Sequence, residues 1–123
     1  MPMSVTIYHN PRCSKSRQTL EILKENGVEP SVVEYLETPP DAETLKAILN
    51  MLNISAKQLL RTQEDEFKQA GFDREGLKND RYGEDQIIKA MITFPKLIER
   101  PIVVSNGKAI IGRPPSLVLD IIE

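Results

Sequence analysis

Residues 102–111 read Ile102-Val103-Val104-Ser105-Asn106-Gly107-Lys108-Ala109-Ile110-Ile111, so that two runs rich in β-branched residues flank an Asn-Gly pair. Two-residue loops of this composition form type I′ turns, whose twist matches that of antiparallel strands. We therefore predict a β-hairpin over these residues. After Gly112-Arg113-Pro114-Pro115-Ser116, a closing amphipathic helix is predicted from the helical spacing of four apolar residues: Leu117, Val118, Ile121 and Ile122.

The first third of the chain has a pattern typical of parallel strands. Strands are predicted over 5–9 and 31–36, with a helix over 14–26 between them. A strand that returns after one helix forms a βαβ unit with two parallel strands. A βαβ unit followed by a hairpin and a helix is the thioredoxin-like arrangement, so we predict an α/β fold with a mixed sheet.

The middle of the chain predicts helices rather than strands. Apolar residues recur at helical spacing after Asp41, a capping box is predicted at Ser55, and further helices are expected over 64–70 and 84–93. The interval 73–85 is predicted to be polar and mobile. We therefore expect a single domain over 1–123, with a helical insertion at about 40–99 before the third strand.

Composition excludes several classes of function. The chain has 123 residues, of which 40% are hydrophobic, and a formal net charge of −2. This charge argues against a nucleic-acid or anionic membrane surface, which calls for a basic patch. The beginning of the chain lacks the pattern of a signal peptide, and no run approaches the length of a membrane span. We expect a monomeric, cytoplasmic protein that binds neither nucleic acid nor membrane.

Cys13 is the one cysteine of the sequence, and it lies between the first predicted strand and helix. A thiol at a helix N-terminus is close to the positive end of the helix dipole, and Arg12, Lys15 and Arg17 add cationic charge. These features favour a reactive thiolate, although a free cysteine can also be inert packing. Because one cysteine cannot form an internal disulfide, a redox cycle needs a thiol from another molecule.

Two polar residues near Cys13 are candidates for adjusting its protonation. Ser16 lies one helical turn after Cys13, where its hydroxyl could donate to the thiolate or could satisfy helix backbone groups. His9 could adjust the protonation of the thiol or could be a polar residue at a sheet edge. One cysteine and one histidine leave a zinc site incomplete, so we predict no metal.

Three arginines follow or precede predicted elements, namely Arg61, Arg100 and Arg113. Each of them alone is typical of a solvated surface. If the first and third strands are neighbours, Arg100 comes close to Cys13, and guanidinium groups around a thiolate suit a tetrahedral oxyanion. Thioredoxin-like folds place a cis proline before the third strand, which makes Pro101 a candidate, with the commoner trans form as the alternative.

Four separated stretches form a recognisable set: Ile7-Tyr8-His9-Asn10-Pro11-Arg12-Cys13, Leu59-Leu60-Arg61, Arg100-Pro101-Ile102-Val103-Val104 and Gly112-Arg113-Pro114-Pro115. Together and in this order they resemble the glutaredoxin-coupled arsenate reductase (ArsC) family of the thioredoxin-like superfamily. The resemblance implies that Cys13 is the catalytic nucleophile and that the three arginines bind arsenate. His9 and Ser16 match positions tied to activation of the cysteine.

The resemblance also implies a reaction. The Cys13 thiolate would attack arsenate, glutathione would add to the arsenic as co-substrate, and glutaredoxin would remove it as a mixed disulfide while arsenite leaves. No bound cofactor is implied. Two alternatives stay open: a Spx-like redox regulator that binds RNA polymerase, and a glutathione-dependent thiol oxidoreductase without an oxyanion substrate. Ser16 disfavours the regulator, because such proteins typically carry a second cysteine at that position.

Overall fold

The computed structural model describes residues 4–122. The chain divides into two compact units. One contains the residues up to Thr38 and those from Arg100 onward, and the other is Pro39–Glu99. The second unit has nearly the bounds of the predicted insertion, 40–99, while the prediction of a single domain stays a prediction. Within 4–122, no helix has the length and apolarity that a bilayer crossing demands.

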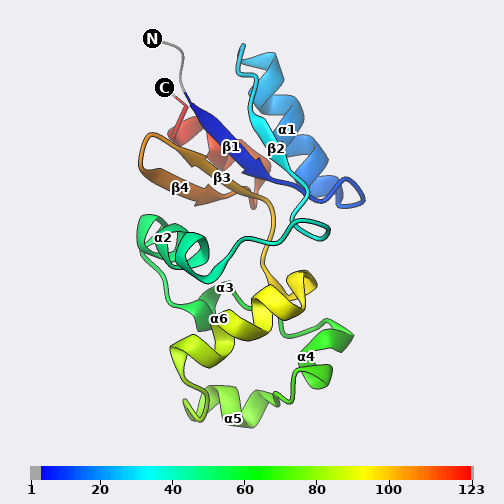
Figure 1. Cartoon of the computed structure of the whole chain (residues 1–123). Helices are drawn as coiled ribbons and strands as arrows, with labels where there is room; N and C mark the ends of the chain where they lie inside the picture. The colour runs from blue at the N-terminus through cyan, green and yellow to red at the C-terminus, as the bar shows by residue number, and fades with distance from the viewer. Residues whose placement is uncertain (1–3, 123) are drawn as a thin grey trace. The chain divides into compact units, whose positions relative to one another are not determined.

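The first unit contains a four-stranded mixed sheet with the order β2-β1-β3-β4 (Figure 1). Strand β1 pairs in parallel with β2 and antiparallel with β3, and β3 pairs antiparallel with β4. This arrangement confirms the predicted mixed α/β sheet, built from a βαβ unit and a hairpin. The strands are β1 (Val5–Tyr8), β2 (Ser31–Val33), β3 (Ile102–Ser105) and β4 (Lys108–Ile111).

The hairpin between β3 and β4 has the predicted turn geometry. Asn106 and Gly107 have φ values of 51° and 79°, and the pair Ser105 and Lys108 closes the ladder beside them. Positive φ at both central residues is what a type I′ turn requires, and Asn and Gly adopt it at low cost. The turn therefore fixes the register of the two strands, as the sequence predicts.

Helix α1 (Ser14–Glu25) and the 3₁₀ helix η2 (Pro115–Asp120) pack against each other and contribute to one core with the sheet. The buried residues of this core are Val5, Ile7, Leu23, Val103 and Val118. The predicted closing helix is therefore present, but as a 3₁₀ helix. Pro115, Val118 and Ile121 recur every third residue, the period of a 3₁₀ helix, and Leu117 N–H bonds to the Pro114 carbonyl at 3.1 Å.

Strand β2 ends earlier than the sequence predicts. The carbonyl of Glu34 accepts hydrogen bonds from the N–H groups of Glu37 and Thr38, both at 3.0 Å, so the chain turns there instead of continuing to residue 36. Strand β1 likewise ends one residue early, at Tyr8. Local turn bonds therefore compete with the sheet at the end where the two parallel strands finish.

The second unit is helical, as predicted. Its core buries apolar side chains of three helices, including Leu45, Ile48, Leu59, Ile88 and Met91. The elements are α2 (Ala42–Leu52), α3 (Ala56–Leu59), α4 (Asp65–Gln69), α5 (Arg74–Lys78), α6 (Glu84–Thr93) and the 3₁₀ helix η1 (Pro95–Leu97).

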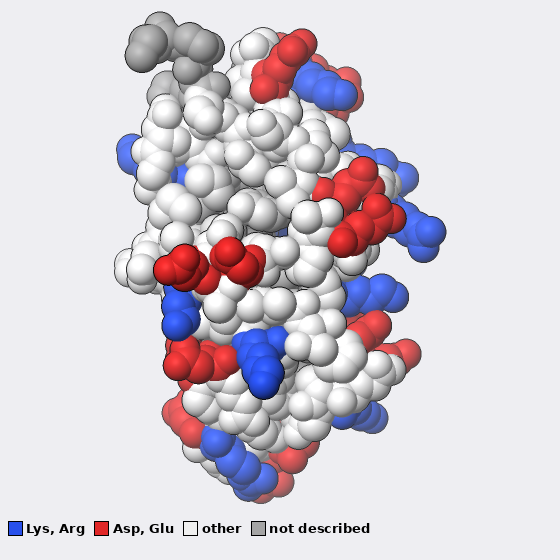
Figure 2. Space-filling model, in the orientation of Figure 1, with Lys and Arg blue, Asp and Glu red and all other residues white. Residues whose placement is uncertain are grey.

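The interval 73–85, predicted to be polar and mobile, contains an ordered helix. The Asp73 side chain accepts a bond from Gly76 N–H and caps α5, and Leu77 is buried. The ring of Tyr82 lies 4.6 Å from that of Phe72, centroid to centroid. Side chains outside the helical pattern therefore anchor this segment. On the face shown in Figure 2, acidic and basic side chains are interspersed.

Candidate active site

The thiol of Cys13 lies where β1 passes into α1. Cys13 is the N-cap of this 12-residue helix, with φ −95° and ψ 124°, and its carbonyl accepts the Arg17 N–H at 3.0 Å. Its own N–H donates to the Asn10 carbonyl, also at 3.0 Å. The half-buried thiol therefore faces the positive end of the helix dipole, the position predicted from the sequence.

The surroundings of Cys13 favour its thiolate form. Burial raises the pKa of Cys13, but the backbone N–H groups of Ser16 and Lys15 and the guanidinium of Arg100 together lower that pKa below its ordinary value. The N–H groups act on the thiol from the first turn of the helix, although the Cys13 side chain forms no cap hydrogen bond of regular geometry. A larger fraction of this thiol is therefore deprotonated at neutral pH than in a free cysteine.

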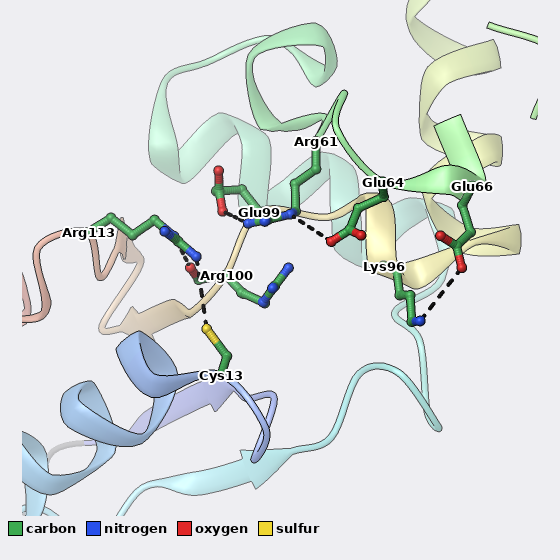
Figure 3. A network of polar contacts seen from close by, with 8 residues as sticks. All are labelled: Cys13, Arg61, Glu64, Glu66, Lys96, Glu99, Arg100 and Arg113. Carbon is green, nitrogen blue, oxygen red and sulfur yellow. Dashed lines mark hydrogen bonds and ion pairs between the residues drawn. The ribbon is translucent and has the colours of Figure 1, made fainter. Parts of the chain in front are cut away.

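Two arginines reach the thiol because β3 pairs with β1. The pairing of Ile102 with Tyr8 brings the beginning of β3 beside the end of β1, so Arg100 comes next to Cys13. One terminal nitrogen of Arg113 lies 3.9 Å from Sγ, while its Nε donates to the Arg100 carbonyl at 2.7 Å (Figure 3). Two of the three predicted arginines therefore meet at Cys13.

Backbone bonds support this arrangement of arginines. The N–H of Gly112 donates to the carbonyl of Pro101 at 2.9 Å, which ties the end of β4 to the segment before β3. The peptide bond between Arg100 and Pro101 is cis, which is one of the two forms that the sequence left open. The bonds of Gly112 and Arg113 tie the end of the hairpin to the carbonyls of Pro101 and Arg100.

The charge that acts on Cys13 differs from the one that the sequence suggested. The side chains of Arg12, Lys15 and Arg17 are exposed, whereas the guanidinium that lowers the thiol pKa is that of Arg100. Lys15 contributes through its backbone N–H. Exposed side chains of the first helical turn are solvated, and water screens their charge.

Ser16 and His9 are joined to each other by a buried hydrogen bond. The Ser16 hydroxyl contacts His9 Nδ1 at 2.6 Å and accepts a bond from the N–H of Asn10 at 3.0 Å. The sequence left two partners open for this hydroxyl, the thiolate and backbone groups, and the buried hydroxyl bonds to a backbone N–H and to His9. Only the backbone of Ser16 acts on the thiol.

His9 is an interior residue. It follows β1, which is a central strand of the sheet, so the alternative of a sheet-edge residue is wrong. Burial lowers the pKa of His9, Glu34 opposes this shift, and Lys24 and Arg17 add to it. The imidazole is therefore held in its neutral form, and Ser16 is the residue through which it reaches the loop of Cys13.

Asn10 is a functional candidate that the sequence reasoning did not select. Its Oδ1 accepts the N–H of Arg12 at 3.0 Å, and its backbone bonds to Ser16 and Cys13. The sequence contained a signal, since Asn followed by Pro11 is the preferred beginning of a type I turn.

Arg61 lies in the helical unit, directly after α3. Its guanidinium is 2.6 Å from a carboxylate oxygen of Glu99 and 3.5 Å from one of Glu64 (Figure 3). The backbone N–H of Arg61 donates to the Leu97 carbonyl at 2.7 Å. The side chain is 21% exposed. Both acidic partners therefore orient Arg61 within its own unit, and its predicted role toward Cys13 stays a prediction.

Comparison with known proteins places the chain in a family. Residues 8–121 match the ArsC family. The chain is 56% identical over 123 residues to YfgD, an uncharacterized protein of Escherichia coli K12, with 99% of each covered. It is 47% identical over 111 residues to an arsenate reductase of Neisseria meningitidis serogroup A, covering 89% of this chain and 91% of the other. A solved arsenate reductase from Vibrio cholerae is 45% identical and has a TM-score of 0.89, over 99% of this chain and 100% of that one. The chain therefore belongs to the ArsC family.

Proposed function

We propose that this protein reduces arsenate to arsenite with glutathione and glutaredoxin as thiol donors, through an adduct between Cys13 and arsenic. The observation that carries the proposal is a thiol of lowered pKa that meets two guanidinium groups, those of Arg100 and Arg113. Its similarity to proteins named arsenate reductase supports the choice of oxyanion. Arg61 joins these residues in the proposal because of the family resemblance.

In the first step, the Cys13 thiolate attacks the arsenic of arsenate. A sulfur–arsenic bond forms, an arsenic–oxygen bond breaks, and the oxygen leaves as water after taking up a proton. The arginines stabilise the oxyanion while its charge redistributes, because guanidinium groups donate two parallel hydrogen bonds to such oxygens. His9 and Ser16 support this step by shaping the loop beneath the thiol.

The electrons come from outside the chain. Glutathione displaces a second oxygen from arsenic as water and forms a second sulfur–arsenic bond. A glutaredoxin thiolate then attacks the glutathione sulfur, and the electron pair of the sulfur–arsenic bond stays on arsenic, which becomes arsenic(III). Water releases arsenite and regenerates the Cys13 thiol. This dependence follows from a chain with one cysteine.

The remaining parts of the proposal concern setting and partners. We place the reaction in the cytoplasm, where glutathione and glutaredoxin keep thiols reduced. The protein is proposed to act as a monomer, without a bound metal or cofactor and without nucleic-acid or membrane partners. Glutathione is a co-substrate in this proposal, and glutaredoxin is the protein partner.

A coupled assay tests the function. The purified protein is incubated with glutathione, glutaredoxin, glutathione reductase and NADPH, and the absorbance of NADPH is followed. Arsenate is expected to start NADPH consumption, with arsenite detected as the product, whereas phosphate is not expected to do so. A glutathione mixed disulfide is tested with glutaredoxin omitted, because glutaredoxin reduces it unaided, and no NADPH consumption is expected there. Turnover of the mixed disulfide without turnover of arsenate would instead identify the thiol oxidoreductase, and absence of arsenate turnover would reject the proposal.

The pH dependence of alkylation measures the state of the thiol. Because the helix N–H groups and Arg100 lower the pKa of Cys13, the thiolate fraction of the native protein rises at a lower pH than that of a free cysteine. The rate of reaction with iodoacetamide is therefore expected to reach its plateau at lower pH in the native protein than in the urea-unfolded chain. Identical profiles for the two states would contradict an activated thiol.

A further inference from the structure

The segment between β1 and α1 is held by three polar atoms of one residue. The N–H of Asn10 donates to the Ser16 hydroxyl, its carbonyl accepts from Cys13, and its Oδ1 accepts from Arg12, each at 3.0 Å. The residue is 9% exposed. Asn10 is therefore bonded both to the end of the loop that carries the thiol and to the buried first turn of the helix.

The bond from Oδ1 has a specific geometric effect. An asparagine side chain that accepts the N–H two residues later closes an Asx turn, which fixes the backbone around Pro11 and Arg12. The bond from Cys13 N–H to the Asn10 carbonyl then completes a four-residue turn. Together these bonds determine the direction in which the chain enters α1, and thus where Sγ lies relative to the helix N–H groups.

We propose that Asn10 is a positioning residue for the reactive thiol: its side-chain oxygen fixes the turn that presents Cys13 Sγ to the N–H groups of Lys15 and Ser16. The residue acts through the backbone of Arg12 rather than by touching substrate. The inference rests on the proposed function in assigning the chemistry to Cys13. Asn10 is neither charged nor nucleophilic, and it contributes to the site by fixing the backbone that carries Cys13.

Alkylation of Cys13 tests this role without arsenate. In Asn10→Ala, the loss of the Asx turn is expected to move the pH profile of the iodoacetamide reaction toward that of the unfolded chain. At neutral pH the rate should fall by about threefold or more, because fewer thiols are ionised. In Asn10→Ser, a shorter side chain that forms such turns more weakly should give a rate between the two.

Asn26→Ala is the matched control. The Asn26 side chain donates to the Ile22 carbonyl at 2.8 Å, at the opposite end of the same helix. This variant loses a side-chain bond of α1 but should keep the wild-type alkylation profile, and urea unfolding reports the stability of each variant. A wild-type profile in folded Asn10→Ala would overturn the proposal. If Asn10→Ala does not fold, Asn10→Ser is the test variant, and a wild-type alkylation profile in Asn10→Ser would likewise overturn the proposal. Arsenate turnover of the wild type is measured in a separate assay. A failure of the proposed function can therefore be distinguished from a failure of the proposed role of Asn10.

Discussion

Cys13→Ser is expected to lower arsenate-dependent turnover by about 10³-fold or more, the scale on which enzymes respond to the loss of their nucleophile. Serine preserves the size of the side chain at the N-cap of α1 and is a preferred residue at that position. Its hydroxyl, however, stays protonated at neutral pH and cannot form the sulfur–arsenic bond. The rate of NADPH consumption in the coupled assay measures the effect.

The control for this variant is Ser14→Ala, which changes an exposed neighbour at the first residue of the helix. We expect its turnover to stay close to that of the wild type. The unfolding transition of Cys13→Ser should resemble the wild-type transition, so that lost turnover reports lost chemistry. Substantial turnover by a well-folded Cys13→Ser protein would rule out the adduct mechanism.

Arg100→Ala is expected to lower kcat/KM for arsenate by about 10- to 150-fold. This range corresponds to the loss of one hydrogen bond to a charged group, about 1.5–3 kcal/mol. Two causes act in the same direction. The variant lacks a donor to the oxyanion, and it lacks the guanidinium that lowers the pKa of Cys13. The pH profile of alkylation should therefore move to higher pH in this variant.

Arg12→Ala separates this effect from general loss of charge. Arg12 is adjacent to Cys13 in sequence but is exposed, so its removal subtracts the same formal charge while leaving Arg100 in place. We expect wild-type alkylation and only a small change in kcat/KM. Equal losses in the two variants would show that the field of the basic turn, rather than the contact with Arg100, activates the thiol.

The parts of the fold that could be predicted from sequence are those set by local chemistry. Asn106-Gly107 determines its turn without help from the rest of the chain, and the βαβ beginning follows from hydrophobic spacing. The helix α5 was missed because its anchors, the cap at Asp73 and the ring contact of Tyr82, carry no helical periodicity. The end of β2 at Val33 depends on turn bonds that compete with the sheet.

The same distinction applies to the candidate site. Cys13 could be predicted because a strand, a turn and a helix follow one another around it. Its interactions with Arg100 and Arg113 depend on which strands pair. The sequence could therefore predict them only on the condition that the first and third strands are neighbours. Spacing left the thiolate and backbone groups as two possible partners for the hydroxyl of Ser16, because spacing does not tell which side of the first helical turn the side chain occupies.

The pairing of β1 with β3 also has a consequence for how the protein is made. Cys13 and Arg113 are 100 positions apart, and synthesis proceeds from the N-terminus. A nascent chain that ends before residue 100 already contains the thiol but lacks β3, Arg100 and the whole hairpin. Its cysteine is therefore closer to an ordinary thiol while the ribosome is still at work. The contribution of Arg100 to the lowered pKa of this thiol is therefore added only with the last fifth of the chain.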